Sequence, residues 1–263
     1  MPGQLVVVKF GGELLETPER LAEVTSGLAA LAADGPLVIV HGGGREIDAE
    51  LQRRGIAKQS VDGLRITDAP TLDAVVAVLA GTINTRLVAA LVTRGVQAVG
   101  LTGVDGGLAR ASRMAAHRAV DGRSVDLGLV GTPDAGASST LLIDLVAQGH
   151  VPVIASLGVD AQGQVLNVNA DTLAAHVAGV AHAGTLVMCG ATAGVLDSEG
   201  ATIPALGRAT ALALIDDGTA SAGMVAKLQA ALAALANGAQ DVWIVDGRTA
   251  AGLLERRGTR VAP

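Results

Sequence analysis

Short, mainly apolar runs recur along the chain without the strict alternation of polar and apolar residues that marks a half-buried strand. Longer segments with helical character separate most of these runs. Continuous apolar runs of this kind indicate strands that are buried on both faces of a parallel sheet. The predicted strands cover residues 5–8, 37–40, 96–101, 151–155, 185–189 and 241–245.

The segments between these runs predict helices, and residues 108–127 suggest hairpins. Thr17 and Pro18 give the first helix an N-cap and a first-turn proline. We therefore expect an α/β fold, a three-layer α/β/α sandwich with a mainly parallel central sheet. No linker divides the chain, so two lobes would share one sheet. The predicted helices cover residues 18–33, 46–54, 70–92, 138–148, 171–181, 222–236 and 250–257.

Composition narrows the class of protein. Hydrophobic residues make up 50% of the 263 residues, and the mean hydropathy is +0.48. Gly, Asp, Arg or Asn nevertheless interrupts every apolar run short of the ~20 residues that a membrane span requires, and no secretory signal is recognisable. Cys189 is the single cysteine, so we expect no intrachain disulfide and a cytoplasmic location. A net charge of −6 and 1% aromatic residues argue against nucleic-acid binding.

Lysine is scarce in this chain. Only Lys9, Lys58 and Lys227 are lysines among 19 basic residues, and the others are arginines. A lysine that persists in such a chain is a candidate for a task that needs a compact point charge, such as contact with a phosphate, rather than a planar guanidinium.

Glycines follow the first two predicted strands directly. Lys9 precedes Gly11 and Gly12, and the second strand ends in His41 and the glycines 42–44. Because glycine has no Cβ, its backbone N–H can approach a phosphate, and a lysine beside it can neutralise a transferring phosphoryl group. A tight turn with a lysine that reaches solvent is the simpler alternative. We expect His41 to be a packed residue rather than a base.

Further polar residues follow in two segments. Arg65 could bind a carboxylate with two hydrogen bonds, and residues 67–68 could cap the next helix. Asn167, Asn169 and Asp171 occupy alternate positions, so they share one side of an extended segment. Helix capping would account for Asp171 alone, but not for the two asparagines.

Lys227 lies about one turn into a predicted helix, after Gly223. Two glycine turns and two lysines indicate a phosphate-rich ligand, and nothing resembles a metal-binding cluster or a Ser-His-Asp arrangement. Phosphoryl transfer by positioning and electrostatics is the reaction class that this combination predicts.

Five motifs in order resemble those of the amino acid kinase family, and more narrowly its N-acetylglutamate kinase members. They are KFGG at 9–12, HGGG at 41–44, DGLRITD at 62–68, NVNAD at 167–171 and GMVAK at 223–227. The resemblance covers nearly the whole chain and extends to residues 258–260. It implies one domain over 1–263, with a lobe at about 1–160 for the acyl amino acid and a lobe at about 161–263 for ATP.

The resemblance also implies roles for individual residues. Lys9 and Lys227 would stabilise the transition state, and Asp171 would orient both lysines. Arg65 would hold the α-carboxylate of N-acetyl-L-glutamate, and Asn167 would hold its acetamido end. The implied substrate-binding residues are Gly43, Gly44, Arg65, Asn167 and Asn169. The implied nucleotide-binding residues are Gly11, Gly12, Ala191, Thr192, Gly194, Val195, Leu196, Gly223 and Met224.

The implied reaction converts N-acetyl-L-glutamate and ATP to N-acetyl-L-glutamyl 5-phosphate and ADP, a step of arginine biosynthesis. Mg²⁺ would arrive with ATP rather than in a dedicated protein cage. The chain begins just before the first predicted strand, as in the short, arginine-insensitive members. A homodimer is implied, with residues 70–94 at the dimer contact.

The chain departs from the family pattern at one notable position. Relatives carry an aspartate where this chain has Ala191, which leaves the affinity for the nucleotide and the choice of nucleotide open. Two other functions also stay open. One is a kinase for aminoadipate or glutamate linked to a carrier protein in lysine biosynthesis. The other is a non-catalytic regulator that binds a nucleotide or an amino acid.

Overall fold

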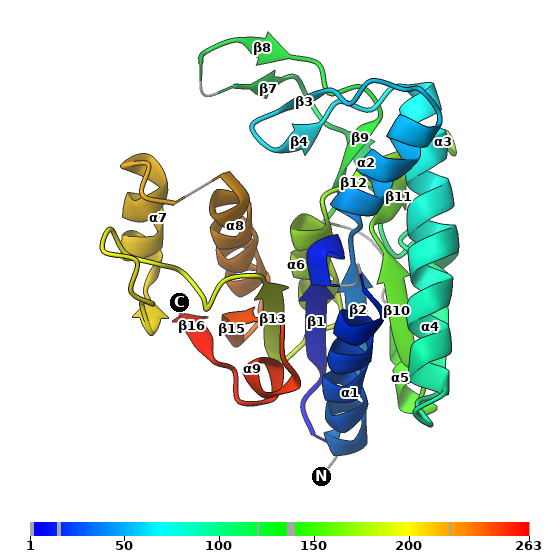
Figure 1. Cartoon of the computed structure of the whole chain (residues 1–263), viewed down its shortest axis with the longest axis vertical. Coiled ribbons are helices and arrows are strands. Elements are labelled where there is room, and N and C mark those ends of the chain that lie inside the picture. Colours follow the sequence, from blue (N-terminus) through cyan, green and yellow to red (C-terminus); the bar gives the residue numbers. More distant parts are fainter. Residues whose placement is uncertain (1–2, 15–16, 120, 136–139, 221, 263) are drawn as a thin grey trace.

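An eight-stranded sheet forms the centre of the protein (Figure 1). The structure is a computed structural model that describes residues 3–14, 17–119, 121–135, 140–220 and 222–262. Six neighbouring strands run parallel, from β5 to β15, whereas β16 is antiparallel to β15 and parallel to β14. The spatial order is β14 (Ala205–Leu206), β16 (Gly258–Val261), β15 (Asp241–Asp246), β13 (Thr185–Gly190), β1 (Val6–Phe10), β2 (Leu37–His41), β10 (Val151–Ala155) and β5 (Ala98–Thr102).

The pairing of β1 with β13 joins the two halves of the chain in this sheet. All six predicted strands are present, and the mainly parallel sheet is confirmed. The predicted last helix, over 250–257, is too long: α9 ends at Leu254 and the chain continues into β16. Arg256 has a φ of 52°, a left-handed conformation that ends the helix before the chain pairs with β15.

Helices cover both faces of the sheet, which gives the expected three layers (Figure 1). On one face lie α1 (Pro18–Asp34), α2 (Gly44–Arg53), α3 (Ala69–Val76), η2 (Ala77–Ile83), α4 (Asn84–Val92) and α9 (Ala250–Leu254). On the other lie α5 (Thr140–Ala147), α6 (Ala170–Val180), α7 (Arg208–Asp216) and α8 (Ala222–Ala236). The first two residues of the predicted helix 138–148 lie outside the described residues.

Smaller sheets flank the carboxyl ends of the central strands. One consists of β11 (Leu157–Val159), β12 (Val165–Val168), β9 (Val130–Pro133) and β6 (Ala111–Arg113). Two hairpins, β3 (Ser60–Val61) with β4 (Leu64–Arg65) and β7 (His117–Arg118) with β8 (Ser124–Val125), lie together at the top of Figure 1. The β7–β8 hairpin confirms part of the expectation for residues 108–127.

The side chains of β1 alternate between the two cores. Val7 packs in the core that contains α6 and α8, whereas Val8 and Phe10 pack in the core that contains α1 and α4. Since successive side chains of a strand point to opposite faces, Lys9 points to the same face as Val7. The sheet therefore directs Lys9 toward α6 and α8.

Helices α3, η2 and α4 form one continuous helix, Ala69–Val92, that is long and apolar enough to cross a membrane by length and composition alone. In this structure its inner side packs on the sheet, where Leu87 and Leu91 are fully buried. Asn84 donates its side-chain amide to the backbone oxygens of Leu101 and Val153, at 3.2 and 2.8 Å. These contacts fix the helix to β5 and β10.

His41 is fully buried at the end of β2, next to the side-chain amide of Asn84. The Asn84 amide nitrogen lies 3.1 Å from His41 Nε2, and His41 Nδ1 lies 3.3 Å from the Gly42 oxygen. Because the Gly42 carbonyl oxygen only accepts, Nδ1 carries the ring proton, and the unprotonated Nε2 faces the Asn84 amide, which shares its two hydrogens among three acceptors. His41 is thus the packed residue that the sequence predicts.

We expect His41 to make the protein less stable as the pH falls. Burial lowers the pKa of His41 from 6.5 to about 4, and the hydrogen bond to Gly42 opposes this only in part. Between pH 6.5 and 4 the unfolded chain binds a proton at His41 and the folded chain does not. The free energy of unfolding therefore falls with pH, by about 3 kcal/mol over this window.

Urea unfolding at pH 7 and pH 5 measures this effect when the wild type is compared with the His41→Gln variant. The wild type should lose about 2 kcal/mol more than the variant between the two pH values. Other titrating groups are common to both proteins, so equal losses would contradict the assignment to His41.

Candidate active site

Two lysines meet one carboxylate at the carboxyl end of the central strands. Lys9 Nζ of β1 lies 2.8 Å from Asp171 Oδ1, in the first turn of α6. Lys227 Nζ of α8 donates to both oxygens of Asp171, at 3.1 and 3.2 Å. Lys9 is 5% exposed and Asp171 6%. The sequence analysis predicts all three residues, and the structure brings them together in a Lys–Asp–Lys cluster in which Lys9 and Asp171 are buried and Lys227 is partly buried.

Burial and mutual contact shift the pKa values of this cluster in different directions. Burial would raise the pKa of Asp171, but the two lysines hold it below its usual value. Burial would lower the pKa of Lys9, but Asp171 and Glu13 outweigh burial and raise it. Burial and the charge of Lys9 lower the pKa of Lys227, against the attraction of Asp171. Asp171 is therefore ionised and shared between the two ammonium groups.

Two cavities adjoin this cluster. The first cavity, of about 240 Å³, lies between the two glycine turns, the β3–β4 hairpin and β12. The second cavity, of about 330 Å³, lies between β13, the start of α8 and the same hairpin. Lys227 lines only the second cavity. The residues that line both are Lys9, Glu13, Gly63, Leu64, Asn169 and Asp171. The cluster therefore lies where a group could pass between the two cavities.

The two glycine turns approach each other so closely that side chains would not fit. A Cβ at Gly12 would lie 2.7 Å from the Cα of Gly43, and a Cβ at Gly43 would overlap Ile83. Helix α2 begins at Gly44 in this turn, and its N-cap Gly43 supplies no side-chain hydrogen bond. The N-terminal end of α2 thus borders the first cavity at Gly43 and Gly44, where the positive end of the helix dipole favours an anion.

Arg65 contributes a guanidinium to the first cavity. Its Nη2 donates to Asp48 Oδ1 at 2.5 Å and to the Gly44 oxygen at 3.1 Å. Its Nη1 is buried and has no hydrogen-bond partner among the described residues. A buried donor without a partner is costly, and Arg65 lines the first cavity, so a carboxylate that reaches this guanidinium could supply the missing acceptor.

Both predicted asparagines line the first cavity. Asn167 Nδ2 donates to Thr67 Oγ1 at 3.1 Å. Asn169 is the N-cap of α6, and its Oδ1 accepts hydrogen bonds from the N–H groups of Asp171 and Thr172 at 2.9 and 3.1 Å. The cap is thus Asn169, which leaves the Asp171 carboxylate free to contact the lysines.

The residues expected to bind the nucleotide separate into three groups. Ala191, Thr192, Gly223 and Met224 line the second cavity. Gly11 and Gly12 line the first cavity, next to Lys9.

Gly194, Val195 and Leu196 line neither of these two cavities. Val195 is buried, and its N–H donates to Thr259 Oγ1 at 2.8 Å, so its contacts are with β16.

Sequence reasoning did not identify the turn of the β3–β4 hairpin as a wall of the site. Asp62 and Gly63 have φ values of 48° and 80°, and Gly63 lines both cavities. An Asp-Gly pair between short strands is a hairpin signal that could have predicted this turn. Glu13 and Ser156, which also line the first cavity, carry no such signal.

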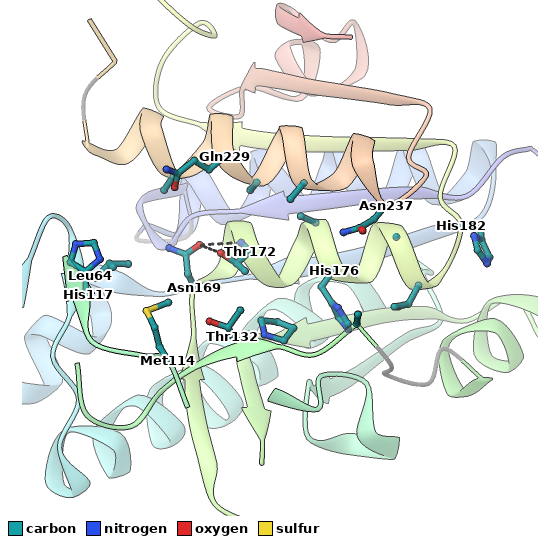
Figure 2. A pocket seen from close by; sticks show the side chains of 18 residues that line it. Leu64, Met114, His117, Thr132, Asn169, Thr172, His176, His182, Gln229 and Asn237 are labelled. Atoms are coloured by element: carbon teal, nitrogen blue, oxygen red, sulfur yellow. Dashed lines mark hydrogen bonds between the residues drawn. The ribbon is translucent and has the colours of Figure 1, made fainter. Parts of the chain in front are cut away.

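A larger cavity of about 860 Å³ lies beside this centre, between α6, α8 and β9. Figure 2 shows His176 of α6 and Gln229 of α8 on one side and Thr132 of β9 on the other. None of the three residues of the Lys–Asp–Lys cluster lines it. Its size therefore does not make it the reaction centre, because the buried charges lie elsewhere.

The carboxylates near the Lys–Asp–Lys cluster show whether protein side chains alone could hold a metal ion there. Among the described residues, no group of three or more His, Cys, Asp or Glu side chains could hold a metal ion. Both Asp171 oxygens contact lysine, and the other carboxylates that line the second cavity are Glu13 and Asp62. This donor set fits a Mg²⁺ ion that is held mainly by nucleotide phosphates.

Comparisons with known proteins agree with this arrangement. The "Amino acid kinase family" model matches residues 4–246. The chain is 42% identical over 253 residues to the acetylglutamate kinase of Acidiphilium cryptum, covering 94% of this chain and 84% of that one. It is 41% identical over 258 residues to the acetylglutamate kinase of Methanopyrus kandleri, covering 97% and 99%.

A solved structure of N-acetylglutamate synthase from Neisseria gonorrhoeae, complexed with coenzyme A and N-acetyl-glutamate, has a similar fold. The TM-score is 0.83 at 26% identity, and the match covers 100% of this chain and 60% of that longer chain. The expected fold and family are thus confirmed by the sheet topology, by the family match and by full-length relatives. The chain belongs to the amino acid kinase family.

Proposed function

We propose that this protein transfers the γ-phosphoryl group of ATP to the side-chain carboxylate of N-acetyl-L-glutamate. The products are N-acetyl-L-glutamyl 5-phosphate and ADP, and the reaction belongs to arginine biosynthesis. The observation that carries this proposal is the Lys–Asp–Lys cluster at the junction of the two cavities. The names of relatives at about 40% identity over most of the chain support the same reaction.

The substrate needs no activation as a nucleophile, because its side-chain carboxylate is ionised at neutral pH. A carboxylate oxygen attacks the γ-phosphorus, a new O–P bond forms, and the bond between the γ-phosphorus and the β-bridging oxygen breaks. The electron pair of that bond leaves with ADP. No general base is needed, and Asp171 is unsuited to be one since its pKa is lowered.

The lysines act on charge during the transfer. Negative charge spreads over the phosphoryl oxygens in the transition state, and Lys9 and Lys227 neutralise it from β1 and α8. Asp171 holds both ammonium groups in place before the substrates bind, so little reorganisation is required at the moment of reaction.

The cavities take different parts of the substrates in this proposal. N-Acetylglutamate occupies the first cavity, with its α-carboxylate at Arg65 Nη1 and its acetamido group toward Asn167. The ATP phosphates occupy the second cavity, near Thr192 and Gly223, and Mg²⁺ arrives with them. The first cavity draws mainly on residues 1–160, in keeping with an acyl-binding N-terminal lobe and a nucleotide-binding C-terminal lobe.

We also propose a cytoplasmic homodimer. The outer side of the helix Ala69–Val92 carries small or apolar exposed residues, among them Ala77, Ala89 and Val92, and Val92 is 53% exposed. This side supports the dimer contact that the sequence leads us to expect.

A steady-state assay tests the proposed function. N-Acetylglutamate, ATP and Mg²⁺ should give an acyl phosphate that is trapped by hydroxylamine as a hydroxamate. Turnover only with a carrier-linked aminoadipate or glutamate would instead identify the lysine-pathway kinase. ATP binding without acyl phosphate from any of these carboxylates would identify a non-catalytic regulator.

The Arg65→Ala variant tests the assignment of the first cavity. We expect KM for N-acetylglutamate to rise about 10- to 100-fold, since a charge-assisted hydrogen bond to the α-carboxylate is lost. The kcat value and KM for ATP should change little, because Arg65 does not line the second cavity. An unchanged KM for N-acetylglutamate would remove Arg65 from the substrate site.

A further inference from the structure

Lys58 is the one lysine outside the Lys–Asp–Lys cluster. Together with Arg65 it contacts the carboxylate of Asp48, so this protein has a second carboxylate that is shared by two cations. Lys58 lies between α2 and β3, and its Nζ lies 2.8 Å from Asp48 Oδ2. The other oxygen of Asp48 accepts the hydrogen bond from Arg65 Nη2. From this geometry we infer that Lys58 is a positioning residue that sets the affinity for the acyl substrate without contacting it. The inference rests on the proposed binding of the α-carboxylate at Arg65.

Asp48 fixes the guanidinium of Arg65. Asp48 and the Gly44 oxygen both accept from Nη2, so they hold one end of the guanidinium and leave Nη1 for a ligand. Asp48 is, however, a carboxylate next to a proposed carboxylate site. Arg65 and Asp48 together carry no net charge, so they would attract an anion only weakly.

Lys58 changes this balance. With Lys58 the group of three carries a net charge of +1, and the Asp48 charge is offset on the side away from Arg65. Partial burial would raise the pKa of Asp48, but hydrogen bonds from Lys58 and Arg65 lower it, so Asp48 stays ionised at neutral pH. Among the groups that contact Asp48, Lys58 is thus the cation that offsets its charge and lets Arg65 act on the substrate as a cation.

The position of Lys58 also fits an electrostatic role beside the first cavity. The charged residues that line a further hollow of about 280 Å³ are Lys58, Asp48, Arg65, Arg45 and Glu13. The hollow shares Glu13, Gly44, Gly63 and Arg65 with the first cavity. The Lys58 ammonium thus borders a hollow that shares lining residues with the first cavity.

Stability does not explain this ion pair. The side chain of Lys58 is 51% exposed and that of Asp48 32% exposed. Exposed pairs of this kind contribute little to folding and are screened by salt. The pair is therefore better suited to modulating the charge of Arg65, whose side chain is 12% exposed.

A series of charges at position 58 tests the inference. Lys58→Met should raise KM for N-acetylglutamate about three- to tenfold at low ionic strength, and Lys58→Glu should raise it further. Lys58→Arg should retain the wild-type KM because it retains the charge. The kcat value and KM for ATP should stay within about twofold in all three variants, and the differences in KM should shrink as KCl is added.

Arg54→Met is the matched control. Arg54, the C-cap of α2, pairs with Glu50 of that helix and lines none of the cavities that adjoin Arg65. Its removal takes away one positive charge in the same part of the chain and should leave KM unchanged. Melting temperatures of all variants should match the wild type, which separates a loss of affinity from a loss of folding.

The outcomes separate this inference from the proposed function. A KM that rises in Arg65→Ala but is the same across the Lys58 series would overturn the role of Lys58 alone. A rise in Lys58→Met that Lys58→Arg does not restore, or that Arg54→Met equals, would also overturn it. An unchanged KM in Arg65→Ala, or no turnover of N-acetylglutamate by the wild type, would overturn the proposed site and this inference together.

Discussion

The Lys9→Met variant will bind both substrates almost normally and turn them over about a hundred- to a thousandfold more slowly. Lys9 lies where the two cavities meet, so its charge faces the phosphoryl group mainly during transfer. An interaction that strengthens only in the transition state affects kcat more than KM. Loss of one preorganised donor to a developing charge typically costs this much in rate.

Steady-state kinetics with both substrates measures the effect, and Lys227→Met should behave in the same way. Methionine is chosen because it keeps the length and apolar stem of lysine without the charge. Lys9→Arg should not restore the rate. Lys9 is only 5% exposed, so the larger planar guanidinium does not fit the space that the lysine side chain occupies. A variant in which only KM rises would show that Lys9 binds substrate in the ground state instead.

The Asp171→Asn variant will lose both stability and activity. Lys9 and Lys227 would keep two positive charges side by side without their shared carboxylate. Removing one partner from a buried ion pair typically costs about 3–5 kcal/mol of the free energy of unfolding. The kcat value should fall as well, because the two ammonium groups are no longer held in place.

The pH dependence identifies the cause. The pKa of Lys227 is already lowered, and without Asp171 its proton is held more weakly still. Raising the pH from 7 toward the ordinary pKa of lysine, about 10.4, should therefore recover part of the lost stability, because the folded chain gives up this proton before the unfolded chain does. Urea unfolding at both pH values measures this, and an equal deficit at both would contradict charge repulsion as the cause.

A triple variant, Lys9→Met with Asp171→Leu and Lys227→Met, serves as the control for folding. Replacing all members of a buried charged group by apolar residues of similar size is often neutral for stability. The triple variant should unfold at nearly the same urea concentration as the wild type and show no kinase activity. Such a result would separate the catalytic role of the charges from any role in folding.

Much of the fold follows from local pattern. Buried parallel strands produce continuous apolar runs, and all six predicted strands are present. The C-terminal strand β16 could not be predicted, because its existence depends on pairing with β15 and on the left-handed conformation of Arg256. Neither is visible in the periodicity of the residues around it.

The candidate site shows a similar division. Motifs predict Lys9, Asp171 and Lys227, and the alternation of β1 explains why Lys9 faces α6 and α8. Asp48 could not be identified from the sequence, because its importance arises from contacts with two residues distant in the chain. The same is true of the β3–β4 turn, which becomes a wall of the site only through tertiary packing.

The scarcity of lysine has a practical consequence for covalent labelling. Lys9 and Lys227 are buried within an ion pair, whereas the side chain of Lys58 is 51% exposed. Besides the α-amino group of the chain, an amine-reactive ester would therefore acylate Lys58 first, in the hollow that adjoins the first cavity. Attachment of a dye or a surface through amines would neutralise the charge beside Asp48. A tag that does not react with amines is therefore the better choice for binding measurements on this protein.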